Sequence, residues 1–219
     1  ITRNLKDSTR AYSVAVAGVN EAIAAVIKEQ MGPGRNRGAD AAADEESVAW
    51  RMNREMPPVP FGGGSYKVSI RNESGRIDIN RAGSELWKAI LKGFGLDAQE
   101  RNVIVDSIMD WRDANDLHRP NGAEDDYYQS LDPPYNCKDG DFDTVDELLL
   151  VRGVTPELFH NGLAQLATVL PDAKTEDHDF DRININAAPE AMLKRLPGMS
   201  PELVEAVQEF RREADFRSR

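Results

Sequence analysis

The sequence DWRDANDLHRPNGAEDDYY, residues 110–128, concentrates acidic side chains between aromatic residues near its two ends. The Pro-Asn-Gly sequence at residues 120–122 predicts a turn that divides this segment in two. Like charges this close repel each other by about 1 kcal/mol per pair even in water, and by more where solvent is excluded. The segment is therefore either an open, solvated acidic loop or a loop whose charge is neutralised by a bound cation.

A second acidic group follows, formed by Asp139, Asp141 and Asp143. A bend at the Pro-Pro sequence, residues 133–134, could bring this group back toward the first. Its alternating spacing resembles the start of an EF-hand loop, but Thr144 and Leu150 stand where the glycine and the bidentate glutamate of that loop belong. Ca²⁺ binds six to eight hard oxygen ligands, such as the carboxylates of these two acidic groups. The sequence therefore predicts an irregular calcium site built from two loops.

Composition limits the other classes of partner. The 219-residue chain carries a formal net charge of −11, which disfavours phosphate backbones and anionic membrane surfaces. Its one cysteine, Cys137, has no metal-ligand spacing around it and is interpreted as an uninvolved thiol. The three histidines are far apart in sequence and do not predict a zinc site.

No run of eighteen apolar residues is present, and the missing initial methionine suggests a trimmed or processed chain.

The N-terminal part predicts the start of an α+β domain. Residues 9–30 form an amphipathic helix whose apolar stripe is rich in alanine. Residues up to 46 are typical of a surface linker, and residues 47–56 of a short helix. Alternation of apolar and polar residues at 66–70 and 76–80 predicts a β-hairpin packed on the long helix.

From residue 82 onward a helical unit occurs three times, centred on Gly95, Gly153 and Gly198. In each copy a short helix ends near the glycine, and an oxygen-bearing residue two positions later caps the next helix: Asp97, Thr155 or Ser200. This arrangement is typical of a helix-hairpin-helix.

The sequences Ile-Asp-Ile-Asn at residues 77–80 and Ile-Asn-Ile-Asn at residues 183–186 are nearly the same. We expect both to be strands of one sheet, which makes the segment between them a helical insertion. The expected domains are residues 1–81 (helix, linker and hairpin), 82–180 (inserted helical domain with the acidic loops) and 181–219 (return strand and the last helix-hairpin-helix unit).

Two alternative functions are open at this point. Helix-hairpin-helix turns often hold DNA phosphates, although here few basic residues surround them. Paired carboxylates could serve glycoside hydrolysis or hold a catalytic metal, but no candidate base, nucleophile or phosphate loop accompanies them.

The order of these features resembles the K-type minor pseudopilins of bacterial type II secretion systems, over about residues 75–201. The residues that carry the resemblance are Asp110–Asp113, Asn121–Tyr128, Pro133–Tyr135, Val145–Val151, Gly153, Thr155–Phe159 and Ile183–Ala188.

The resemblance implies an α+β, type IV pilin-like fold, a long N-terminal helix on an antiparallel sheet, with a large inserted α-helical domain. It implies a non-enzymatic subunit at the tip of the pseudopilus, in complex with the I-type and J-type minor pseudopilins and not with nucleic acid. It also implies an inner-membrane anchor through an N-terminal helix preceding this chain, with the protein facing the periplasm. Carried over by position, the ligands of Ca²⁺ are Asp113, Asn115, Asp116, Glu124, Asp125 and Asp139.

Overall fold

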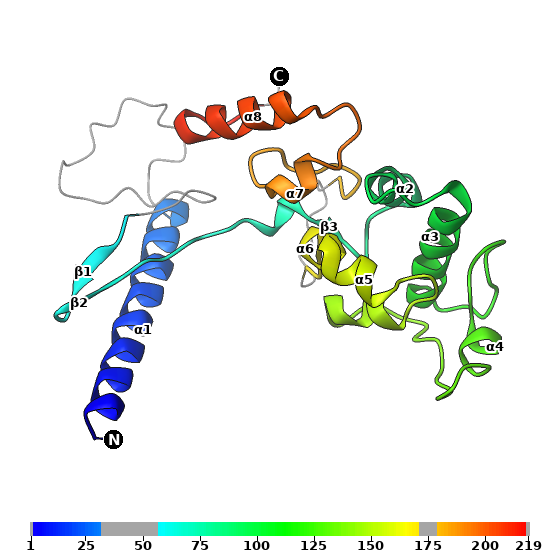
Figure 1. The fold of residues 1–219 in the computed structure, drawn as a ribbon, viewed down its shortest axis with the longest axis horizontal. Helices are drawn as coiled ribbons and strands as arrows, with labels where there is room; N and C mark the ends of the chain where they lie inside the picture. Colours follow the sequence, from blue (N-terminus) through cyan, green and yellow to red (C-terminus); the bar gives the residue numbers. More distant parts are fainter. Residues whose placement is uncertain (1, 32–56, 171–178, 218–219) are drawn as a thin grey trace. The chain divides into compact units, whose positions relative to one another are not determined.

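The computed structural model describes residues 2–31, 57–170 and 179–217 and divides the chain into two compact units, Ile1–Asn72 and Glu73–Arg219 (Figure 1). The linker and the short helix expected at residues 32–56 lie outside the described residues. The first unit contains α1 Thr2–Met31, β1 Val59–Phe61 and β2 Gly64–Tyr66.

In the first unit a β-hairpin lies against the long helix α1 (Figure 1). Strands β1 and β2 are antiparallel, with Val59 opposite Tyr66. The two residues that join them, Gly62 and Gly63, have φ angles of +56° and +73°, which is the backbone of a tight hairpin turn whose twist matches that of the strands. The Tyr66 ring lies against Gly18 of α1, where any side chain would collide with it.

This hairpin is not the predicted one. Residues 66–70 and 76–80 do not pair; β2 ends at Tyr66, and residues 67–72 form no regular element. The consecutive glycines at 62–64, between two short apolar segments, are a turn signal that the predicted hairpin did not use. The alternation at residues 76–80 belongs to a strand of the second unit.

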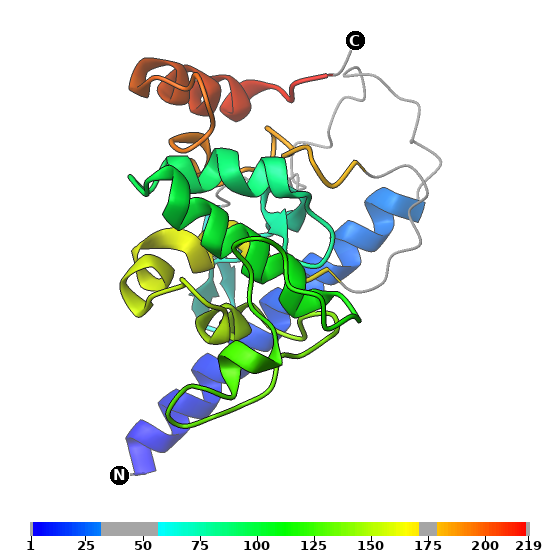
Figure 2. The same ribbon diagram turned by 90° about the vertical axis from the view of Figure 1, so that its right-hand side faces the viewer.

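The second unit is mainly helical. Its elements in chain order are η1 Glu73–Gly75, β3 Ile77–Asp78, α2 Ser84–Lys92, α3 Ala98–Arg112, α4 Asp125–Tyr128, η2 Val145–Leu150, α5 Pro156–Leu158, the π-helical turn η3 Phe159–Leu163, α6 Ala164–Leu166, β4 Ala167–Thr168, α7 Glu190–Leu193 and α8 Pro201–Glu213. Figure 2 shows α2 and α3 side by side, joined by a short turn. Their apolar faces, including Trp87, Ile90, Ile104 and Ile108, are buried in one core with Leu163, Leu166 and Leu193.

The prediction that residues 77–80 and 183–186 are strands of one sheet is wrong for residues 183–186. Strand β3 pairs in parallel with β4, with Ile77 opposite Ala167. Residues 183–186 form no strand, because the Asn184 side chain accepts a hydrogen bond from the Asn186 amide at 3.0 Å and bends the backbone. The Asn184 amide still reaches the Ser74 carbonyl at 3.1 Å, so the segment lies beside the residues that precede β3.

The local chemistry of the three repeated turns is as predicted. Gly95, Gly153 and Gly198 have φ angles of +77°, +87° and +81°. The side chain of Asp97 caps α3 and forms a capping box with Glu100, while the side chains of Thr155 and Ser200 cap α5 and α8. Whether these turns act as helix-hairpin-helix modules stays a prediction.

Candidate functional site

The acidic segment begins at the last turn of α3, where Asp110 is completely buried. Its carboxylate accepts hydrogen bonds from the Arg119 backbone amide, at 3.0 Å to Oδ2, and from Arg119 Nη1, at 2.5 Å to Oδ1. The same Arg119 Nη1 lies 2.7 Å from Asp113 Oδ2. A buried carboxylate needs such a partner. The pairing of Arg119 with Asp110 and Asp113 therefore closes residues 110–119 into a loop.

Three of the predicted calcium ligands lie within this loop. Asp113 Oδ1 accepts hydrogen bonds from the amide and the side chain of Asn115, and Asn115 Oδ1 accepts one from the Leu117 amide at 3.1 Å. Asp116 is exposed to solvent. The polar atoms of Asp113 and Asn115 therefore already hold the turn, and Asp113 is also paired with Arg119.

Asp125 connects this segment to the second loop. It is the first residue of α4, and its Oδ1 accepts a hydrogen bond from the Cys137 amide at 2.7 Å, while Oδ2 accepts one from Gln129 at 3.1 Å. The loop after α4 is thus held against the start of that helix. Of the second acidic group, Asp143 turns instead to Lys138 Nζ, at 2.7 Å.

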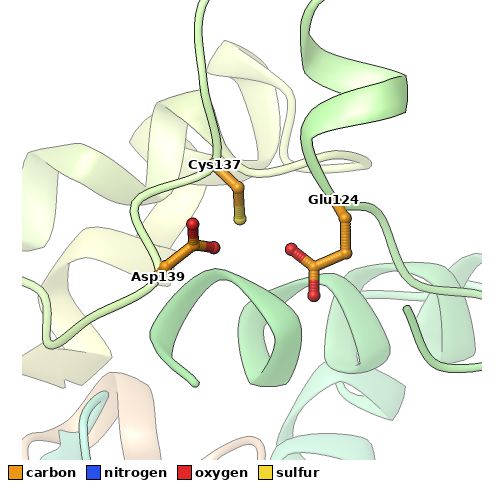
Figure 3. Close-up of side chains that lie close together, drawn as sticks. All are labelled: Glu124, Cys137 and Asp139. Carbon is orange, nitrogen blue, oxygen red and sulfur yellow. The ribbon is translucent and has the colours of Figure 1, made fainter. Parts of the chain in front are cut away.

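Glu124, Cys137 and Asp139 come together between the two loops (Figure 3). Each offers one ligand atom, and these atoms all lie within 4.8 Å of one another. Glu124 is 3% exposed, and neither of its carboxylate oxygens has a hydrogen-bond partner. We call Glu124, Cys137 and Asp139 the thiol–carboxylate cluster.

The electrostatics of this cluster follow from burial. Burial raises the pKa of Glu124 to about 7, and the nearby charges of Asp110, Asp139 and Asp113 act in the same direction, while the neighbouring Cys137 thiol opposes them. Burial also raises the pKa of the Cys137 thiol, which is therefore neutral at pH 7. An anionic Glu124 without a charged partner is costly in such surroundings, and a bound cation would remove that cost.

A cluster of packed aromatic rings lies next to the acidic loops. The ring of Trp111 contacts those of Tyr128, Tyr135 and Phe142, with centroids 5.1, 6.3 and 6.3 Å away. Phe142 also exchanges two backbone hydrogen bonds with the Asn80 side chain, at 2.8 and 2.9 Å. The loops are consequently fixed at both ends by packed residues of the core.

The structure thus brings Glu124 and Asp139 into one cluster and places Asp113 close enough to affect the pKa of Glu124. It uses Asn115 and Asp125 to hold the loops, and leaves Asp116 at the surface. Reasoning from the sequence missed Cys137, because metal-ligand spacing was sought along the chain and Cys137 meets Glu124 only through the fold. It also missed the pairing of Asp110 with Arg119.

A family model described as "Type II secretion system (T2SS), protein K" matches residues 69–172, which include both acidic loops. This match covers just under half of the chain and makes it similar to the protein K family. Among curated members of this family, the protein of Pectobacterium carotovorum is 29% identical over 107 residues, which are 49% of this chain and 30% of the relative. That of Aeromonas hydrophila is 37% identical over 89 residues, which are 40% of this chain and 27% of the relative.

A solved structure shows that the similarity extends to the fold. A chain in the crystal structure of the GspK-GspI-GspJ complex from the type 2 secretion system of enterotoxigenic Escherichia coli matches with a TM-score of 0.60 and 16% identity. The match covers 95% of this chain and 69% of that chain. The matched residues span less than a third of the length of the two curated relatives named above.

Proposed function

We propose that this chain is a non-enzymatic minor pseudopilin of a type II secretion system, with the pilin-like architecture implied by a long helix that carries a hairpin. It occupies the tip of the pseudopilus and supports protein export across the outer membrane. The observation that carries the proposal is the family match over residues 69–172. The second unit, Glu73–Arg219, adds bulk beyond the helix and hairpin, which would hinder another pilin-like subunit from stacking above it.

The exposed face of α1 supports assembly with similar subunits. Val19 and Ile23 are each 53% exposed, and Val16 and Ile27 on the same helix are also exposed. Apolar side chains in such a continuous stripe gain free energy when another helix covers them. We propose that this face packs against the helices of neighbouring subunits, including the I-type and J-type minor pseudopilins, because the similar solved complex joins GspK to GspI and GspJ.

Co-purification tests this role. We expect the full-length protein to co-purify with I-type and J-type minor pseudopilins, and Val19→Asp together with Ile23→Asp to abolish this while leaving the helical content unchanged. Leu117→Asp is the matched control, because Leu117 is 79% exposed but lies in the acidic segment. Unchanged co-purification of the α1 variant would contradict the proposed face, and no complex with the unaltered protein would contradict the proposed function.

A membrane attachment is part of the proposal. By length and composition alone, residues Asn4–Lys28 of α1 could cross a membrane. Because the hairpin packs on this part of α1, we assign the anchor instead to the N-terminal helix that the resemblance implies before it. We infer that an N-terminal helix anchors the protein in the inner membrane with the second unit in the periplasm. Fractionation of cells that express the full-length protein should place it in the inner membrane, resistant to carbonate extraction.

We also propose that the acidic loops bind Ca²⁺. Glu124 fits this ion best, since both of its oxygens are buried without a partner, and Asp139 and Asp113 are the nearby carboxylates. Chelation should lower the melting temperature, and calcium at about 100 times its Kd should restore about 2.7 kcal/mol of stability. Glu124→Gln should remove this response, whereas Asp146→Asn, which alters an exposed carboxylate, should retain it.

Binding to DNA is a weaker alternative, because basic residues near the repeated turns are engaged within the chain. Arg152 lies over the Tyr127 ring at 4.6 Å and donates to the Gly122 carbonyl, and Arg195 lies over the Phe94 ring at 4.1 Å. Lys194 is paired with Glu190. Retention on duplex DNA that falls steeply with salt would favour this alternative.

A further inference from the structure

The thiol–carboxylate cluster contains a ligand that calcium does not use. Figure 3 shows the Cys137 thiol directed toward the space between the carboxylates of Glu124 and Asp139. Its sulfur belongs to the set of three ligand atoms that lie within 4.8 Å of one another. Calcium selects hard oxygen ligands, whereas a thiolate favours softer ions such as Zn²⁺ and Cd²⁺.

One hydrogen bond fixes the position of the thiol, and a second observation concerns the carboxylate opposite it. The Cys137 amide donates to Asp125 Oδ1 at 2.7 Å, and Asp125 is the residue after Glu124. This hydrogen bond places the sulfur opposite the carboxylate that precedes α4. The Glu124 carboxylate is 97% buried within the same cluster and has no hydrogen-bond partner, so it points independently to a missing ligand.

The dimensions are close to those of a three-ligand zinc site. Zinc–sulfur and zinc–oxygen bonds of about 2.3 and 2.1 Å put the ligand atoms of a tetrahedral site about 3.5 Å apart. Since the ligand atoms lie within 4.8 Å of one another, the cluster needs to contract by at most about 1.3 Å, which small rotations of the side chains would provide. A water molecule or a partner group would complete the tetrahedron, as it does in three-ligand zinc sites.

We propose that Glu124, Cys137 and Asp139 bind a thiophilic divalent cation of the Zn²⁺ class, through one carboxylate oxygen of each acid and the Cys137 sulfur. Binding converts the thiol to a thiolate and releases its proton to solvent. The two carboxylates are shared with the proposed calcium site, so the two ions compete. The site rests on the geometry of the cluster and is independent of the role in secretion.

Cadmium provides a direct test, because a thiolate–cadmium bond gives a charge-transfer band in the ultraviolet. Since Cys137 is the only cysteine of the chain, the band reports this one sulfur. The protein is freed of metal with a chelator, kept reduced, and titrated with CdCl₂ and, in competition, with ZnCl₂. We expect a band that saturates at one equivalent, is displaced by Zn²⁺, and is weakened by millimolar Ca²⁺.

Variants distinguish metal binding by the whole thiol–carboxylate cluster from metal binding by the Cys137 thiol alone. Cys137→Ser should abolish the band and lower the affinity for Zn²⁺ at least about tenfold while retaining stabilisation by calcium, because only the soft ligand is removed. Glu124→Gln and Asp139→Asn should each weaken cadmium binding about tenfold or more, and the control Asp146→Asn should leave it unchanged. If both carboxylate variants bind cadmium as tightly as the unaltered protein, Cys137 acts as a lone thiol and the proposal is overturned.

A measurement on the unaltered protein covers the case in which Cys137→Ser fails to fold. Zn²⁺ at one equivalent should slow alkylation of Cys137 in the native protein at least about tenfold, whereas excess Mg²⁺ should not. Equal alkylation rates with and without Zn²⁺ would overturn the proposal. Loss of the calcium response in Cys137→Ser with unchanged zinc affinity would overturn it as well, since the thiol would then serve calcium-dependent folding rather than zinc.

Discussion

Arg119 Nη1 lies 2.5 Å from Asp110 Oδ1, and the Asp110 carboxylate is completely buried at the end of α3. The same nitrogen reaches Asp113 Oδ2 at 2.7 Å, so one partly exposed guanidinium neutralises two acids of the segment. Part of the charge crowding in this stretch is therefore relieved by the chain itself. The cation proposals concern the remaining charge around Glu124.

Removing this arginine should destabilise the second unit. Arg119→Met leaves the buried Asp110 carboxylate with only the backbone amide, which should cost about 3 kcal/mol in urea unfolding. The control is Arg182→Met, because the Arg182–Asp179 pair is exposed on both sides and should contribute less than about 0.5 kcal/mol. Combining Arg119→Met with Asp110→Asn should recover part of the loss; similar losses for both arginine variants would contradict the structure.

The pKa of Glu124 predicts how stability depends on pH when divalent cations are absent. Burial raises this pKa from 4.5 to about 7, so the folded protein keeps a proton that the unfolded chain releases between these values. The free energy of unfolding should therefore fall as pH rises from about 4.5 to 7, by up to about 3 kcal/mol. Melting curves at several pH values in the presence of a chelator measure this change.

Glu124→Gln should remove that part of the pH dependence and make the metal-free protein more stable than the unaltered one at pH 8. Glu157→Gln makes the same chemical change at an exposed position and should keep the original dependence. If Glu124→Gln retains the full slope between pH 4.5 and 7, the carboxylate is not buried as the structure places it.

Local signals predicted the helix ends well, because the groups that satisfy a helix terminus are neighbours in sequence. Asp97 and Glu100 form a capping box across three residues, and Thr155 and Ser200 each precede a proline at the first helical position. Such contacts need no knowledge of the rest of the fold.

Long-range pairing could not be predicted in the same way. The repeated Ile-x-Ile-Asn pattern fits a buried strand but does not specify its partner, and β3 pairs with residues 167–168, which carry no comparable pattern. Cys137 meets Glu124 for the same reason: the contact depends on how the loop after α4 folds back, which the hydrogen bond from the Cys137 amide to Asp125 fixes. The spacing of residues along the chain does not predict that hydrogen bond.

In the first unit, Gly18 should control how closely the hairpin approaches α1. A methyl group at this position would lie 2.6 Å from Tyr66 Cδ2, so Gly18→Ala must displace the ring. We expect it to loosen the hairpin and to accelerate amide hydrogen exchange in β2 severalfold. The control Gly64→Ala lies in the same hairpin with its nearest neighbour 3.8 Å away, and should leave exchange nearly unchanged.

The repeated turns offer a comparison between backbone strain and steric collision. Gly95 and Gly153 have similar positive φ angles, but a methyl group at Gly95 meets nothing within 4 Å, whereas one at Gly153 would lie 2.8 Å from Ile104 Cγ1. Gly95→Ala should therefore cost only the strain of the left-handed backbone, about 1 kcal/mol, and Gly153→Ala should cost about 1–3 kcal/mol more. Urea unfolding of the two variants measures the difference. Because the collision is with Ile104 Cγ1, the variant Ile104→Ala, which removes this atom, should reduce the extra cost at Gly153 but not the cost at Gly95. Equal costs for the two glycine variants would mean that the second turn does not press on α3.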